Sequence, residues 1–170
     1  MTTRKIAFAG VLGALYAAVT IFLAPISYGP IQLRVAEALM VLPFFFPYSV
    51  WGLFVGVIVA NLFSPYGVLD IVGGSLASLL AALCTMRLGL INRDSFKLKA
   101  LACAPAIIVN ALVIGAIIAW AQTSGGPAFW PAFVVAGGWV GLGQLVVLYA
   151  LGLPLLVLLP GMPFLKSLDG

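Results

Sequence analysis

Long apolar runs dominate the chain, and turn-forming residues divide these runs into six segments. The charge-free runs cover residues 6–24, 38–69, 71–86 and 100–165. A helix needs about 20 apolar residues to cross the hydrocarbon core of a membrane, so these runs predict several membrane-spanning helices. Proline, glycine and short polar stretches place six helices at about residues 5–24, 34–46, 48–63, 69–88, 99–121 and 131–160.

The second of these helices is short, and Pro43 and Pro47 are expected to close it. The composition agrees with a membrane protein, because 64% of the residues are hydrophobic and 7% are charged. Soluble domains carry roughly a quarter charged residues. The first run could be a signal peptide, but no small-x-small cleavage site follows it. We therefore expect one all-α integral membrane domain over residues 1–170.

The basic residues predict which side of the membrane each loop faces. Six spans place both termini on one side, and short cytoplasmic flanks are rich in Lys and Arg. Seven of the eight basic residues then share the cytoplasmic face, together with Asp94 and Asp169: Arg4, Lys5, Arg87, Arg93, Lys97, Lys99 and Lys166. Because these residues sit in short flanks, the net charge of +4 indicates membrane topology and not nucleic-acid binding.

Three charges remain, and all of them fall near the outer ends of predicted helices. Arg34 and Glu37 begin the second helix, and Asp70 begins the fourth. A charge inside a membrane costs roughly 2.5–3.5 kcal/mol on insertion scales, so it is usually paired or functional. A pair between Arg34 and Glu37 is one interpretation, but base before acid is the poorer order along a helix. Arg34 is also disfavoured at a helix N-terminus, so we expect it to need another partner, with Asp70 the candidate.

Further polar and aromatic residues are weaker candidates for the same site. Asn61, Asn110 and Gln144 lie in the third, fifth and sixth helices, where a lone amide often only bonds a neighbouring helix. Tyr28, Tyr66, Trp120 and Trp130 gather at the outer level, where an interfacial aromatic belt is the ordinary explanation. Some of them could also stack on a flat ligand.

Small residues recur at four-residue spacing, which allows helices to approach closely. The first helix has two such stripes, one with Gly10, Ala14 and Ala18 and the other with Gly13 and Ala17. Gly52 and Gly56 form a similar pair in the third helix. One stripe of the first helix is therefore available for a separate subunit.

The sequence offers no sign of enzymatic chemistry. It contains no histidine, and Cys84 and Cys103 lie in apolar runs without neighbouring ligand types. The usual zinc sites and Ser–His catalysis are thereby excluded, and we expect no catalytic residue, metal or cofactor. A G-x-x-x-x-G-K-[ST] phosphate loop is also missing, so this chain has no ATPase site of that type.

Two stretches carry a resemblance to a known family. APISYGPIQLRVAEALMVLPFFFP, at residues 24–47, and WGLFVGVIVANLFSPYGVLDIVGGSLAS, at residues 51–78, are similar to the queuosine-precursor transporter (QueT) family. Its members are S components, the substrate-binding membrane subunits of energy-coupling factor (ECF) importers. The S-Y-G-P-I-Q-x-R-x-x-E-A-L block is the most specific part, and the resemblance is strong over about residues 5–90.

The resemblance implies a six-helix bundle in a bacterial cytoplasmic membrane, with a ligand pocket near the outer surface. It also implies a transmembrane coupling (T) subunit and two ATPase subunits as partners, with Ala14 and Ala18 matching the helix-one contact motif. The implied substrates are 7-deazaguanine bases such as preQ0, preQ1 and queuine, or the nucleoside queuosine. Carboxylates and an arginine suit such a ligand, because its edge carries adjacent N–H donors and a carbonyl.

Two other functions remain open from the sequence. The protein could be an S component for another vitamin-like solute, such as riboflavin, thiamine or a pyridoxal compound, because binding loops vary on a shared scaffold. It could also be a stand-alone proton-coupled carrier that uses Glu37 and Asp70 as its relay.

Overall fold

The computed structural model describes residues 2–29 and 31–161, and these residues form helices and no strands. Lys166 and Asp169, which the sequence places on the cytoplasmic face, lie outside the described residues. In chain order the elements are α1 (Thr3–Phe22), α2 (Ala24–Ser27), the 3-10 helix η1 (Val35–Phe44), α3 (Ser49–Asn61), the π-helix η2 (Asp70–Gly74), α4 (Ser75–Ile91), α5 (Phe96–Leu101), α6 (Ala104–Thr123), α7 (Phe129–Val147), the π-helix η3 (Leu148–Gly152), α8 (Leu153–Leu158) and the 3-10 helix η4 (Leu159–Gly161).

The six predicted segments correspond to six helical stretches of two lengths. Four are long and apolar enough to cross a membrane: Thr3–Phe22, Asp70–Ile91, Phe96–Thr123 and Phe129–Gly161. The other two are the shorter apolar helices Val35–Phe44 and Ser49–Asn61. The expectation that Pro43 closes the second helix needs correction, because Pro43 lies inside η1 and Phe44 follows it as the last residue.

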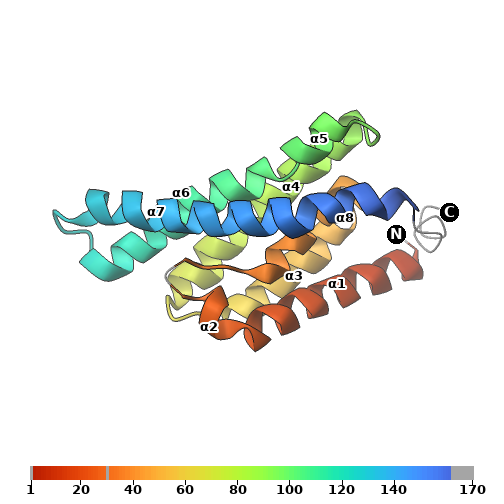
Figure 1. Cartoon of the computed structure of the whole chain (residues 1–170). Coiled ribbons are helices and arrows are strands. Elements are labelled where there is room, and N and C mark those ends of the chain that lie inside the picture. Colours follow the sequence, from red (N-terminus) through yellow and green to blue (C-terminus); the bar gives the residue numbers. More distant parts are fainter. Residues whose placement is uncertain (1, 30, 162–170) are drawn as a thin grey trace.

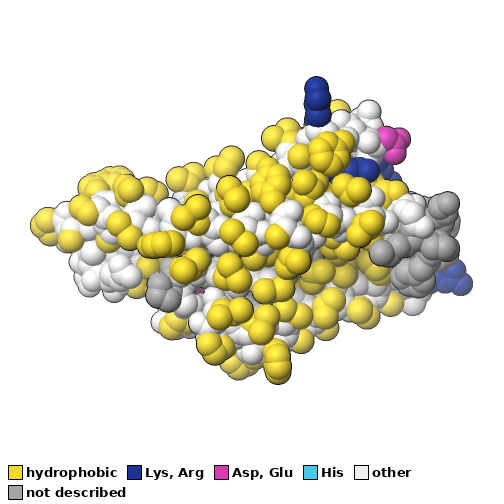
Figure 2. Space-filling model, viewed as in Figure 1, with side chains coloured by type: hydrophobic (Ala, Val, Ile, Leu, Met, Phe, Trp, Pro, Cys, Tyr) yellow, Lys and Arg dark blue, Asp and Glu magenta, His cyan; other side chains and the backbone are white. Residues whose placement is uncertain are grey.

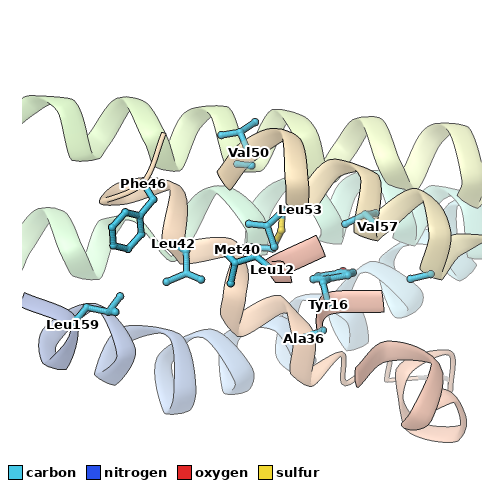
Figure 3. Packing of buried hydrophobic residues seen from close by; sticks show 12 residues of the cluster. Leu12, Tyr16, Ala36, Met40, Leu42, Phe46, Val50, Leu53, Val57 and Leu159 are labelled. Atoms are coloured by element: carbon cyan, nitrogen blue, oxygen red, sulfur yellow. The ribbon is translucent and has the colours of Figure 1, made fainter. Parts of the chain in front are cut away.

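The short helix η1 lies in the middle of the bundle. Most of its residues are buried, including Glu37, Met40 and Phe44. Figure 3 shows its side chains Met40 and Leu42 among residues of α1 and α3, with Tyr16 and Leu53 nearby. Because nearly all residues of η1 are buried, the neighbouring helices surround it and provide the lipid-facing surface.

Glycine allows α1 and α3 to pack at backbone distance. A Cβ atom on Gly13 would overlap the carbonyl oxygen of Gly52, and one on Gly56 would overlap that of Gly13. Ala17 is buried on the same side of α1, whereas Gly10, Ala14 and Ala18 are exposed. Of the two predicted stripes, the one with Gly13 therefore packs inside the molecule and the one with Ala14 faces outward.

The two ends of the bundle differ in shape and in charge. The start of α1, the end of α8 and the helix α5 lie toward one end, and the α6–α7 hairpin projects from the other (Figure 1). Yellow apolar side chains cover most of the face shown in Figure 2, and dark-blue basic side chains lie toward the α5 end. This surface is that of a multi-pass membrane protein, with charge confined to an end.

Candidate functional site

A buried ion pair joins two segments that are far apart in the sequence. Arg34 Nη2 lies 3.1 Å from Asp70 Oδ2, and both residues are buried, at 3% and 0% exposure. Arg34 is the residue before the first residue of η1, and Asp70 is the first residue of η2. The sequence-based expectation that Arg34 finds its partner in Asp70 is confirmed. The residues that hold this pair, Arg34, Asn61 and Asp70, are called the Arg34 cluster below.

Asn61 completes the Arg34 cluster from the end of α3. Its Oδ1 accepts a hydrogen bond from Arg34 Nη1 at 3.1 Å, and its Nδ2 donates to the backbone oxygen of Asp70 at 3.0 Å and to Ser75 Oγ at 3.1 Å. Gly74 makes room for this arrangement, because a Cβ there would overlap Asp70 Oδ1. The Asn61 amide thus bonds a backbone oxygen of η2, the first hydroxyl of α4 and the Arg34 guanidinium.

Glu37 has its own partners. Tyr16 of α1 donates a 2.6 Å hydrogen bond to Glu37 Oε1, and Asn110 Nδ2 of α6 donates to Oε2 at 3.4 Å. These three residues are all buried. Since the Arg34 ion pair goes to Asp70, the interpretation of Arg34 and Glu37 as a self-contained pair is wrong, although both charges lie in the same buried region.

Tyr28 connects the Arg34 cluster to a cavity. The Arg34 guanidinium carbon lies 5.2 Å from the centroid of the Tyr28 ring, a cation–π distance. The Tyr28 hydroxyl donates to the backbone oxygen of Ala60 at 2.6 Å, which holds the ring in place. The same ring lines a cavity of about 660 Å3, whose lining comprises Tyr28, Tyr66, Ile118, Gln122, Ala128, Pro131, Ala132, Val135, Ala136 and Trp139.

The two tyrosines stay neutral at physiological pH. Partial burial raises the pKa of Tyr28 and the pKa of Tyr66 above the ordinary value for a phenol. Each hydroxyl therefore remains able to donate a hydrogen bond.

Several buried acceptors have no hydrogen-bond partner among the described residues. They include Asp70 Oδ1, Asn110 Oδ1 and Gln144 Oε1, which come from η2, α6 and α7. A buried polar atom without a partner costs about 1–3 kcal/mol, so such atoms usually have a structural or functional explanation.

The predicted aromatic residues divide into two groups. Tyr28 and Tyr66 line the cavity, whereas Trp130 is 70% exposed and is absent from the cavity lining. Trp120 is also exposed at 53% and contacts Phe129. Trp139 and Gln122 also line the cavity, although the sequence did not indicate them as site residues. A signal for Trp139 existed in the four-residue spacing of Pro131, Val135 and Trp139, which places them on one face of α7.

Loop residues before η1 are held against α7. Gln32 has a left-handed backbone with a φ angle of 48°, which is uncommon for a residue with a side chain. A Cβ on Gly143 of α7 would lie 2.6 Å from the backbone oxygen of Ile31. Glycine at 143 therefore allows the loop that leads to Arg34 to run directly beneath α7.

Comparison with known proteins identifies a family for the chain. A family model described as QueT transporter matches residues 6–160, which include every candidate site residue discussed here. No curated protein and no solved structure matches the chain. Because the family match covers nearly the whole chain, the protein belongs to the QueT transporter family.

Proposed function

We propose that this protein is the substrate-binding membrane subunit of an ECF-type importer, and that it takes up a 7-deazaguanine compound of the queuosine group. Family membership supports a transport function. The observation that carries the choice of ligand is the aromatic cavity beside the Arg34 cluster. A cavity of about 660 Å3 falls in the range of small-molecule sites, roughly 300–1,000 Å3.

The shape of the cavity suits a flat heterocycle. Tyr28, Tyr66 and Trp139 contribute aromatic side chains to the lining, and Gln122 contributes an amide. Stacking of a base on an aromatic side chain contributes about 1–3 kcal/mol. In this proposal the deazaguanine ring stacks on one or more of these side chains.

The unpartnered acceptors suit the polar edge of the same ligand. A 2-amino-pyrimidinone edge presents adjacent N–H donors, and the three buried oxygens of Asp70, Asn110 and Gln144 can only accept. These residues lie outside the cavity lining, so the proposal requires the interior to open toward the cavity when the ligand binds. The buried charges of Arg34, Glu37 and Asp70 leave a net negative charge when all are ionised, which also favours a protonated aminomethyl substituent. In this proposal Arg34 is a positioning residue for Tyr28 and Asp70.

The energy for uptake comes from partner subunits in this proposal, and α1 offers a surface for them. A groove of about 680 Å3 runs between α1 and α3, and Gly10, Ala14 and Gly52 are among its lining residues. Small residues let another helix approach closely in a membrane. The T subunit would dock there, and two ATPase subunits would bind the T subunit on the cytoplasmic side, which the basic flanks mark.

Titration calorimetry of the purified protein tests the ligand. We expect submicromolar binding of at least one compound among preQ0, preQ1, queuine and queuosine, and no heat with riboflavin. Trp139→Ala should weaken binding by about tenfold or more, in line with the loss of one stacking partner. Trp130→Ala is the matched control, because this tryptophan lies on the same helix outside the cavity, and its affinity should equal that of the wild type. Flat heats with all four compounds would refute the choice of substrate.

Copurification with a T subunit tests the docking surface. Ala14→Leu should abolish the complex because the larger side chain fills the groove, while ligand binding remains. Ala121→Leu, at an exposed position on α6, should leave the complex intact. An intact complex in Ala14→Leu would argue against docking at this stripe, and uptake by the chain alone in liposomes would favour the proton-coupled carrier instead.

A further inference from the structure

A second groove lies between α4 and α6, away from the cavity and from the α1 surface. Its volume is about 620 Å3, and its lining consists of Leu83, Cys84, Arg87, Leu88, Ile91, Leu101, Ala104, Pro105, Ile108 and Val109. Arg87 is the charged member of this otherwise apolar lining. The groove forms where α5 ends at Leu101 and α6 begins at Ala104, beside the last turns of α4.

Arg87 has no counter-ion within the protein as described. Among the described residues, the ion pair joins Arg34 and Asp70. Arg87 makes no hydrogen bond or ring contact with a described residue. Lys99, by comparison, lies 5.6 Å from the Phe45 ring centroid. A guanidinium without a partner in the described protein is free to bind an anion from outside the chain, such as a phosphate.

The surroundings of Arg87 are strongly basic. Arg93, Lys97 and Lys99 follow in the next twelve positions, against the single carboxylate of Asp94. Arg87 lies one turn before α4 ends at Ile91. On α4 the groove lining runs from Leu83 to Ile91, so Arg87 lies within it, close to the level where a helix leaves the hydrocarbon.

We propose that this groove binds an anionic phospholipid, with the phosphodiester at Arg87 and an acyl chain along the apolar walls. Basic pockets between membrane helices on the cytoplasmic side bind anionic headgroups for this reason. A protein helix fits less well, because Leu83, Leu88 and Ile108 are bulky, whereas helix–helix interfaces favour small residues. The lipid would fix the angle between the α4–α5 end and α6. This inference does not depend on which solute the protein carries.

Native mass spectrometry of the detergent-solubilised full chain tests the proposal. Phosphatidylglycerol and phosphatidylcholine with identical acyl chains are titrated separately, and the dissociation constant of the first bound lipid is measured. The wild type should prefer phosphatidylglycerol by about fivefold, which corresponds to about 1 kcal/mol for one basic residue near an anionic headgroup. Arg87→Gln should lose that preference, and Arg87→Lys should restore part of it.

Arg93→Gln is the matched control, because it removes the same charge from the same basic segment without touching the groove lining. It should keep the preference for phosphatidylglycerol. Ala104→Phe, which fills the groove without changing charge, should weaken the first binding event of both lipids. Equal affinity of the wild type for the two lipids would overturn the proposal. A preference for phosphatidylglycerol that survives in Arg87→Gln would also overturn it. Undiminished lipid binding in Ala104→Phe would overturn it as well, and this variant tests the proposal even if Arg87→Gln does not fold.

Discussion

The Arg34 guanidinium holds the polar interior of this molecule together. It contacts Asp70 and Asn61 directly, and it makes a cation–π contact with the ring of Tyr28, which lines the cavity. Burying a pair of charges is not by itself stabilising, because desolvation can exceed the attraction. Removal of one partner is a different matter, since it leaves the other charge buried and uncompensated.

We therefore expect Arg34→Gln to lower the free energy of unfolding by about 3–5 kcal/mol, the range for breaking a buried pair from one side. Equilibrium unfolding in mixed detergent micelles measures this effect. Arg4→Gln removes a charge from an exposed position and should change stability by less than about 0.5 kcal/mol. Equal stability of the two variants would show that Asp70 is neutralised without Arg34.

Some contacts of individual residues could be predicted from the sequence, and others could not. The need of Arg34 for a distant partner could be deduced from its place at a helix N-terminus. The link between Tyr16 and Glu37 could not, because a tyrosine in an apolar run carries no sign of the acceptor it will reach. Trp130 and Trp139 are equally apolar in sequence, yet Trp139 lines the cavity and Trp130 does not.

At the level of helices, the contact between α1 and α3 leaves no room for added side-chain atoms. Gly13 meets the backbone of α3 at Gly52 and Gly56. Gly10, one turn earlier on α1, has no atom within 4 Å of an added Cβ. The same substitution is therefore expected to have different effects on stability at Gly13 and at Gly10.

Gly13→Ala should destabilise the protein by about 1–3 kcal/mol, because the new methyl group forces two backbones apart. Gly10→Ala should be neutral or slightly stabilising, since alanine is the better helix former by about 1 kcal/mol. Thermal unfolding of both variants in one detergent compares them. A loss of stability in Gly10→Ala as large as in Gly13→Ala would mean that the two stripes are wrongly assigned.

Helix geometry itself was only partly predictable. The six stretches lie within a few residues of their predicted positions because proline and glycine interrupt the hydrophobic runs. The 3-10 geometry of η1 and the π-helices η2 and η3 have no sequence signature of that kind. Such departures arise when packing and local hydrogen bonds outweigh regular α-helical geometry.

Across the whole molecule, the two ends of the bundle should face opposite compartments. Asp94 lies in the basic α4–α5 connection, and Pro127 lies in the turn between α6 and α7 at the other end (Figure 1). Both residues are exposed. The positive-inside rule assigns the Asp94 side to the cytoplasm.

Single cysteines at these positions test the orientation in intact cells. With Cys84 and Cys103 replaced by alanine, Pro127→Cys should react with a membrane-impermeant maleimide, and Asp94→Cys should react only after the cells are opened. The reverse pattern would mean an inverted protein. Labelling of Asp94→Cys in intact cells would contradict an arrangement with the basic loop inside.

The sequence alone determined the membrane environment, the helical class and the approximate ends of six helices. It could do so because a bilayer leaves helices as the available structure for apolar segments in which every backbone group must be bonded. Only the tertiary structure decided which face of each helix points inward. Segments that are apolar all round have no polar face to mark their rotation, so packing against neighbours sets it. That rotation brings Arg34 to Asn61, turns Trp139 toward the cavity and leaves Ala14 on the surface.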